Sequence, residues 1–465
     1  MASARRHTGS PLRRKGAGAR GARLGACALS LVLAAALCPF LPTPAFADVR
    51  KADVVLGQTV DARGLSVAQC PSVDAEYALV MDAEGTVYFE RNAQSPAQIA
   101  SITKIMTAVV ALDAVEAGET TLDAAIPVSA AAAAVGESSA GLQEGDVMDL
   151  ETALKALLVP SGNDAAVAIA EALGGSVEAF VERMNEKAAE LGCADTVYEN
   201  PHGLDYDQYA GDLHSTAADV AAVVRHAMEN DVFRSIVSGG STDIAVVRDG
   251  AEATIHLETT DGFLDVYEHA IGVKTGFTAL AGPSFAGAAN NGARELYAIV
   301  LNSSSEAQRF EDAKTLCEWV YEHLVSYQLA NSPETTTYNG AEVPVVAEVA
   351  HEGWIDKTVR ATLSDPDAAV DIFDLNGNVS QTLSFERLEG DVRAGDKVGT
   401  ITFKQRNEEI AVLDLVACED LDAPDFFEGI GVWWERLLRG FSGQPQSAPS
   451  VTLNETPLVV DKTAA

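Results

Sequence analysis

Three short motifs follow one another in a fixed order along this chain of 465 residues, and they constrain its fold more than any other feature. Ser-Ile-Thr-Lys spans 101–104, Ser-Gly-Asn spans 161–163, and Lys-Thr-Gly spans 274–276. A Ser-x-x-Lys motif is expected about twice by chance in a chain of this length, so the first motif alone is weak evidence, whereas the other two are each expected on the order of 0.1 times. Together they supply a hydroxyl beside an amine, a second hydroxyl with an amide, and a cation at the edge of a strand.

The first motif combines a nucleophile with a base. Ser101 and Lys104 are three residues apart, so in a helix predicted over 101–112 both side chains face the same way. A serine hydroxyl is a poor nucleophile until a base removes its proton, and a neutral lysine amine can be that base. Burial and a nearby cation, for which Lys274 is the candidate, both lower the pKa of a lysine. The pattern predicts acyl transfer by a serine that needs no histidine.

The other two motifs offer groups that bind a substrate and move protons. Ser161 adds a second hydroxyl for relaying protons to a leaving amine, while the Asn163 amide can hold a substrate amide. Lys274 and Thr275 offer a charge and a hydroxyl to a carboxylate, and the small Gly276 lets a substrate backbone lie close. Taken alone, each motif is also typical of a helix cap, a turn or a strand end. Their conjunction favours the catalytic interpretation.

The N-terminus and the charge balance limit where the protein works and what it binds. The first 47 residues carry seven cations, no acid, an apolar run over 24–41 and a final Ala-Phe-Ala. This predicts a secretory signal peptide over 1–47 and a mature chain outside the cytoplasmic membrane, although an uncleaved anchor is an alternative.

The formal net charge of −36 argues against nucleic acid as a partner. Histidine spacing shows no metal-ligand pattern, so we expect no catalytic metal and no cofactor.

The remaining chain divides by its hydrophobic pattern. After a linker over 48–75, residues 76–326 mix helical patterns with short strands, which predicts an antiparallel sheet flanked by helices. Residues 327–421 contain short, valine-rich or alternating runs, which predict a smaller all-β domain. The expected fold class is therefore α/β (α+β). Four cysteines beyond the signal could pair or remain buried thiols: Cys70, Cys193, Cys317 and Cys418.

The segment over 422–442 has a different pattern. At 100° per residue, its apolar residues between 426 and 441 fall on one side of a helix and its charged residues on the other. With two tryptophans on the apolar side, it resembles a helix that lies in a membrane interface. A terminal helix docked on its own protein is the alternative. Residues 443–465 are polar, with Pro and Thr, and are predicted to be a disordered tail.

The motifs and their neighbours resemble the low-molecular-mass penicillin-binding proteins that act as serine-type D-alanyl-D-alanine carboxypeptidases. The similarity extends to residues 101–108, 160–166, 200–205 and 272–278. It implies a penicillin-binding, β-lactamase-like catalytic domain that cleaves the terminal D-Ala-D-Ala bond of a peptidoglycan stem peptide in the cell-wall space. It also implies acylation of Ser101 by β-lactams, and the family layout includes a β-rich domain and a terminal membrane anchor.

The resemblance assigns further roles. Ser101 is the acylated serine, Lys104 its proton acceptor and Lys274 the substrate-binding cation, while the Phe277 N–H is a second oxyanion donor and Arg309 assists in recognising the terminal carboxylate. Residues 259–264 depart from the asparagine-containing turn that many relatives carry there. Two alternatives remain: a β-lactamase-type hydrolase on the same fold, and a non-catalytic wall-associated binding protein. The class A β-lactamases carry Ser-Asp-Asn where this chain has Ser-Gly-Asn, which argues against the first.

Overall fold

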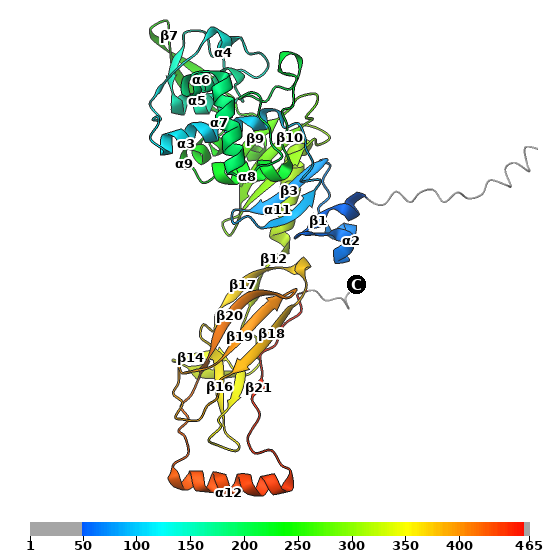
Figure 1. Cartoon of the computed structure of the whole chain (residues 1–465), viewed down its shortest axis with the longest axis vertical. Helices are drawn as coiled ribbons and strands as arrows, with labels where there is room; N and C mark the ends of the chain where they lie inside the picture. The colour runs from blue at the N-terminus through cyan, green and yellow to red at the C-terminus, as the bar shows by residue number, and fades with distance from the viewer. Residues whose placement is uncertain (1–48, 460–465) are drawn as a thin grey trace, which may run out of the picture. The chain divides into compact units, whose positions relative to one another are not determined.

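The computed structural model describes residues 49–459 (Figure 1). The predicted signal peptide falls outside the described residues. The first large element is a seven-stranded antiparallel sheet with the order β2-β1-β4-β3-β11-β10-β9. Its strands are β1 (Val54–Val55), β2 (Gln58–Thr59), β3 (Tyr77–Asp82), β4 (Val87–Arg91), β9 (Ala270–Gly276), β10 (Ser284–Asn290) and β11 (Glu295–Leu301).

Helices cover both faces of this sheet, and the strands alternate accordingly. Leu79 and Met81 of β3 belong to the core that includes α3 and α8, whereas Ala78 and Val80 belong to the core that includes α11. The helices are α2 (Val60–Arg63), α3 (Lys104–Glu116), α4 (Ala130–Ala134), α5 (Leu150–Leu158), α6 (Asn163–Gly174), α7 (Val177–Glu190), α8 (Ala217–Ala227), α9 (Asp231–Ser238), α10 (Phe263–Val266) and α11 (Gln308–His323). The predicted helix-flanked antiparallel sheet is confirmed.

Two features of this part differ from the sequence prediction. The segment predicted as a linker over 48–75 instead adds β1 and β2 to the sheet, because a short apolar run pairs with β4 and fully buries Val55 and Val60. A separate four-stranded sheet was not predicted. It has the order β5-β6-β7-β8 and consists of β5 (Ala125–Pro127), β6 (Val147–Asp149), β7 (Thr242–Arg248) and β8 (Ala251–Leu257).

The β-rich part contains a six-stranded sheet with the order β18-β19-β20-β16-β15-β21 and two smaller strand pairs, β12-β17 and β13-β14. Pro344 is the last residue of β14, and β15 begins three residues later at Ala347. The strands are β12 (Leu324–Gln328), β13 (Thr335–Tyr338), β14 (Ala341–Pro344), β15 (Ala347–Ala350), β16 (Thr358–Leu363), β17 (Ala369–Phe373), β18 (Val379–Phe385), β19 (Lys397–Gln405), β20 (Glu408–Ala417) and β21 (Val451–Thr452).

The disordered tail predicted from residue 443 onwards is wrong for the described part of that segment. Strand β21 pairs with β15, and Asn454 is only 6% exposed. The Asn454 amide donates to Leu329 O at 2.9 Å and accepts from Asn331 N at 2.6 Å. Composition could not reveal this pairing, because only two strand residues and one buried asparagine attach the segment to the sheet.

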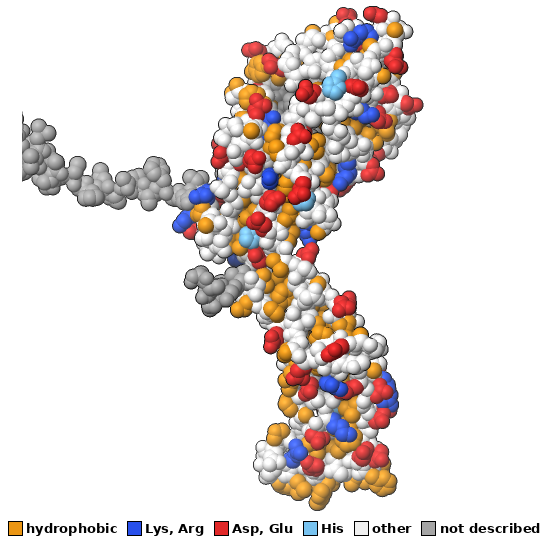
Figure 2. All heavy atoms as spheres, turned by 180° about the vertical axis from the view of Figure 1, so that it is seen from behind, with side chains coloured by type: hydrophobic (Ala, Val, Ile, Leu, Met, Phe, Trp, Pro, Cys, Tyr) orange, Lys and Arg blue, Asp and Glu red, His pale blue; other side chains and the backbone are white. Residues whose placement is uncertain are grey.

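Helix α12 (Phe426–Ser442) begins at a capping box formed by Asp425 and Glu428 and ends at Gly443, which has φ +68°. None of its residues is buried, and Figure 2 shows hydrophobic side chains gathered over this helix. Among the described residues, no helix combines the length and the apolar character needed to cross a bilayer.

Candidate active site

Ser101 lies in a 3₁₀ turn, Ala100–Thr103, that directly precedes α3. The predicted helix over 101–112 therefore starts three residues later, at Lys104, and runs on to Glu116. Tightening of the first turn to 3₁₀ geometry is common at helix ends. The turn keeps the side chains of Ser101 and Lys104 together, as the spacing predicts.

The Lys104 side chain is completely buried and makes three polar contacts. Its Nζ lies 2.9 Å from Ser101 Oγ, 2.7 Å from Asn163 Oδ1 and 2.8 Å from His202 O. Burial lowers the pKa of this amine well below the ordinary lysine value, and the charge of Lys274 lowers it further, while Asp164 opposes the shift. These surroundings favour the neutral amine.

The three contacts match the valence of a neutral amine. A neutral amine has two N–H groups and one lone pair. Asn163 Oδ1 and His202 O are acceptors only, so the two N–H groups satisfy them and the lone pair is left for the Ser101 hydroxyl. The arrangement therefore suits removal of a proton from Ser101.

The second motif lies at the start of α6. Ser161 is 4% exposed and has φ +65°, and its Oγ has no hydrogen-bond partner among the described residues. Asn163 was predicted to hold a substrate amide, but both ends of its amide contact the protein: Oδ1 accepts from Lys104 and Nδ2 donates to Gly136 O at 2.9 Å. This geometry favours a positioning role for Asn163.

The third motif lies at the end of β9. Lys274 is 1% exposed, and its Nζ donates to Thr275 O at 3.0 Å. Burial lowers the pKa of Lys274 to about 7, with the charge of Asp261 raising it and that of Arg309 lowering it. The Thr275 hydroxyl lies 2.8 Å from that of Thr260. A bound carboxylate would favour the protonated form of this lysine.

Gly276 and Arg309 lie beside each other at the same end of the site. A Cβ atom on Gly276 would lie 2.6 Å from Ile99 O, so β9 can pass close to the turn that contains Ser101 only with glycine here. Arg309, at 5% exposed, donates through Nη1 to Gly276 O at 3.3 Å and pairs with Glu306 at 3.4 Å. Phe277, the residue after β9, is 55% exposed.

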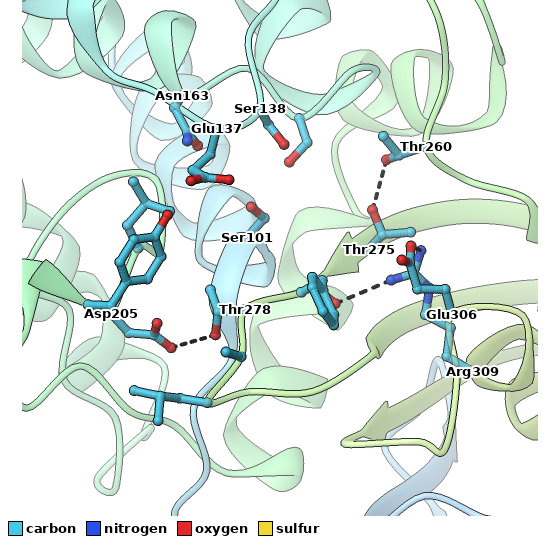
Figure 3. Close-up of a pocket in the computed structure, with 17 residues that line it drawn as sticks. Ser101, Glu137, Ser138, Asn163, Asp205, Thr260, Thr275, Thr278, Glu306 and Arg309 are labelled. Carbon is cyan, nitrogen blue, oxygen red and sulfur yellow. Dashed lines mark hydrogen bonds and ion pairs between the residues drawn. The ribbon is translucent and has the colours of Figure 1, made fainter.

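These groups line one cleft of about 490 Å³ (Figure 3). The structure brings seven of the nine predicted site residues to its wall: Ser101, Ser161, Asn163, Thr275, Gly276, Phe277 and Arg309. Lys104 and Lys274 are buried behind it and contact residues of that wall. Sequence reasoning assigned no role to the other lining residues, although three of them lie in the segments 200–205 and 272–278 that carry the resemblance. These residues are Glu137, Ser138, Leu204, Asp205, Tyr206, Thr260, Thr278, Ala279, Leu280 and Glu306.

Comparison with known sequences gives a consistent result. Residues 65–305 match the family described as D-alanyl-D-alanine carboxypeptidase. The chain is 27% identical over 356 residues to D-alanyl-D-alanine carboxypeptidase DacF of Bacillus subtilis, an alignment that covers 76% of this chain and 87% of that protein. It is 34% identical over 253 residues to DacB2 of Mycobacterium tuberculosis, covering 54% of this chain and 83% of that protein.

Solved structures share the fold. The Streptomyces K15 DD-transpeptidase superposes with a TM-score of 0.51 at 30% identity and covers 54% of this chain and 98% of its own. The D-alanyl-D-alanine carboxypeptidase DacD from Francisella tularensis gives a TM-score of 0.54 at 22% identity and covers 76% of this chain and 94% of its own. At that identity the second comparison supports the fold alone, over a longer part of the chain.

Proposed function

Because this chain belongs to the D-alanyl-D-alanine carboxypeptidase family, we propose that Ser101 is the nucleophile with which it removes terminal D-alanine from peptidoglycan stem peptides. The chain is a serine-type enzyme of that class, and the family acts on the cell wall and binds β-lactams. One observation carries the assignment of Ser101: its Oγ lies 2.9 Å from the fully buried amine of Lys104 beside an open cleft.

Acylation follows from the neutral amine. Lys104 takes the Ser101 proton while Oγ attacks the carbonyl carbon of the penultimate D-alanine. The N–H groups of Ser101 and Phe277 are the proposed donors to the oxyanion that forms. When the C–N bond breaks, the proton passes from Lys104, with Ser161 as relay, to the amine of the departing D-alanine. Lys104 is then neutral again.

Deacylation uses the same base. Neutral Lys104 accepts a proton from a water molecule that attacks the ester carbonyl carbon, and the proton returns to Ser101 Oγ when the ester bond breaks. The products are the shortened peptide and free enzyme. A β-lactam would acylate Ser101 in the same way.

The substrate carboxylate is proposed to bind at the end of the cleft where Thr275 and Arg309 lie. Lys274, Thr275 and Arg309 supply two cations and a hydroxyl there. A C-terminal carboxylate exists only on the last residue of a peptide, so this pairing explains a carboxypeptidase better than an endopeptidase. Arg309 is held by Gly276 O and Glu306, which fixes its guanidinium near the end of β9.

Replacement of Ser101 tests the assignment. We expect Ser101→Ala to release no D-alanine from a diacetylated Lys-D-Ala-D-Ala peptide and to gain no mass from penicillin. Ser238→Ala is the matched control, because the Ser238 hydroxyl donates only to Arg234 O of its own helix. The assignment is wrong if Ser101→Ala releases D-alanine at the rate of the control. Fast turnover of penicillin by the unaltered enzyme would instead favour the β-lactamase alternative.

We further propose that the protein is secreted and that α12 holds it at the outer face of the membrane. The apolar side of this helix is exposed to between 39% and 82%, and no described segment covers it. These residues are Phe426, Phe427, Ile430, Trp433, Trp434, Leu437, Leu438 and Phe441. Aromatic residues on one side and charged residues on the other suit an interfacial helix.

The membrane proposal is testable without removing the tail, which is part of the β-rich sheet. We expect Phe427→Glu with Trp434→Glu to abolish co-sedimentation with phospholipid vesicles, while D-alanine release from a soluble peptide continues. Val247→Glu with Val412→Glu is the control, since both valines are about half exposed and lie outside α12. Equal binding by the two double variants would exclude α12 as the contact.

A further inference from the structure

The proposed reaction gives the Glu137 carboxylate in the cleft no role. Glu137 lines the cleft and is exposed. Its backbone has φ +68°, in the left-handed region that non-glycine residues rarely adopt. A residue held in that conformation at a cleft wall is a reason to ask what its side chain binds.

The loop that carries Glu137 is fixed to the second motif on both sides. Asn163 Nδ2 donates to Gly136 O at 2.9 Å, and Asn163 N donates to Ser138 O at 2.9 Å. Further along the loop, Ser139 Oγ donates to Asp164 at 2.6 Å. Glu137 therefore has a defined position relative to the nucleophile, because the same Asn163 contacts Lys104.

Among the described residues, no cationic side chain forms an ion pair with the Glu137 carboxylate. The phenol of Tyr206 lines the cleft with it, and interaction with the Glu137 carboxylate raises the pKa of this phenol to about 12. Tyr206 thus stays neutral and leaves the negative charge in place. Nearby, Asp205 is 5% exposed, and while its Oδ2 accepts from Thr278 at 2.7 Å, its Oδ1 has no partner among the described residues.

The two sides of the cleft carry charged groups of opposite sign. In Figure 3, Thr275 and Arg309 lie on one side of Ser101, whereas Glu137 and Asp205 lie on the other. A peptide whose terminal carboxylate lies at Thr275 and Arg309, with its scissile bond at Ser101, must extend its preceding residues towards Glu137. The residue before the D-Ala-D-Ala pair is the first whose side chain can reach this wall.

We propose that Glu137, with Tyr206, forms a subsite for a side-chain amine on the residue before D-Ala-D-Ala, so that the preferred substrates are stem peptides with a free amine at that position. This inference rests on the proposed function and deepens it. The amine would donate to the Glu137 carboxylate, and Asp205 lies on the same side of the cleft. Glu137 takes no part in the bond changes.

The expected preference for a substrate with a free side-chain amine is moderate and depends on the salt concentration. An ion pair in an open cleft is partly solvated, so we expect roughly a fivefold preference for the free amine in kcat/KM. Most of the preference is expected in KM, since the contact is the same in the ground state and the transition state. Because the site is open, the preference should decrease as ionic strength rises.

Two peptides test the inference on the unaltered enzyme: Lys-D-Ala-D-Ala with its α-amine acetylated, and the same peptide with the side-chain amine acetylated as well. We expect D-alanine release from both, with the lower KM for the free amine. If neither peptide is cleaved, the proposed function fails and the inference with it. If both are cleaved with equal kcat/KM, the inference alone is overturned.

A charge-neutral variant identifies the residue. Glu137→Gln should bring the ratio of kcat/KM for the two peptides close to one. Glu306→Gln is the matched control, because it removes another carboxylate from the wall, on the Arg309 side, and should keep the ratio. An unchanged ratio in Glu137→Gln, or an equal loss in both variants, would overturn the assignment. If Glu137→Gln does not fold, the salt dependence of the ratio in the unaltered enzyme decides.

Discussion

Gly203 approaches the carbonyl oxygen of Ala100 so closely that a Cβ atom on Gly203 would lie 1.9 Å from that oxygen. Gly203 also has φ +90°, a conformation that suits glycine and strains other residues. Ala100 itself has φ +48° and directly precedes Ser101. The turn that presents the nucleophile is therefore positioned by contact between two backbones.

Gly203→Ala is expected to damage both stability and activity. Relief of the contact requires the backbone at Ala100 to move, so we expect a loss of about 3 kcal/mol or more in the free energy of unfolding, and slower acylation of Ser101. Gly118→Ala is the control: Gly118 has φ +73° with nothing within 4 Å, so about 1 to 2 kcal/mol of backbone strain is expected. Thermal denaturation and penicillin labelling measure the two effects. Equal losses in both variants would show that the close approach is unimportant.

Lys104→Arg is expected to reduce acylation about a thousandfold, because a guanidinium remains protonated at any working pH and cannot accept the Ser101 proton. In the unaltered enzyme only the neutral amine is a base. Its pKa is lowered by burial, so the acylation rate should rise with pH and level off well below pH 10.5. Lys155→Arg, in a surface ion pair with Glu151, is the control. Stopped-flow acylation across pH checks both statements. Acylation of Lys104→Arg at the rate of the control would contradict the first, and a rate that does not change with pH would contradict the second.

The sequence was sufficient to propose those site residues whose chemical role only a few types of side chain can perform. The proposed nucleophile, base and carboxylate-binding cation are Ser101, Lys104 and Lys274, since few other side chains in the motifs supply these groups. Short apolar runs bounded by turn residues were likewise sufficient for strands such as β3 and β10, because both faces of the central sheet pack against helices.

The rest depends on long-range contacts that local patterns do not contain. Glu137 lies in the cleft only because Asn163 fixes the loop on both sides of it. Strand β7 forms a hairpin with β8, which follows it, but its other partner, β6, comes much earlier in the chain, and a single pairing of Val147 with Val247 joins the two. The tail after Gly443 is polar in composition, yet two of its residues complete a sheet.

Asp261→Asn is expected to shift the pH at which substrate binding weakens. Asp261 is buried, which raises its own pKa, and its charge raises that of Lys274. Without this charge the pKa of Lys274 falls, so Lys274 loses its proton at a lower pH and attracts the substrate carboxylate less. KM should therefore rise several-fold near pH 8 while kcat changes less. Asp265→Asn, an exposed neighbour, is the control, and an equal shift in both variants would contradict the prediction.

Ser161→Ala is expected to preserve stability while slowing catalysis. Ser161 Oγ is buried and has no partner among the described residues, so its removal breaks no hydrogen bond and relieves a desolvation cost. D-alanine release should fall about a hundredfold if the hydroxyl relays the proton. Ser303→Ala provides the contrast, since the Ser303 hydroxyl donates to Asp312 at 2.7 Å and its loss should cost about 1 to 3 kcal/mol. A melting temperature that drops equally in both variants would contradict this account.

Asn454→Ala is expected to destabilise the β-rich domain, although Asn454 lies in a segment whose composition predicts disorder. The Asn454 amide donates to Leu329 O at 2.9 Å and to Gln381 Oε1 at 2.8 Å, and it accepts from Asn331 N at 2.6 Å. Removing it leaves these groups without partners in a buried place, which should cost about 2 to 4 kcal/mol. Thr452→Ala, an exposed substitution two residues earlier in β21, should change the free energy of unfolding by less than about 0.5 kcal/mol. Denaturant unfolding that is identical for Asn454→Ala and the unaltered chain would show that the tail does not hold the sheet in solution.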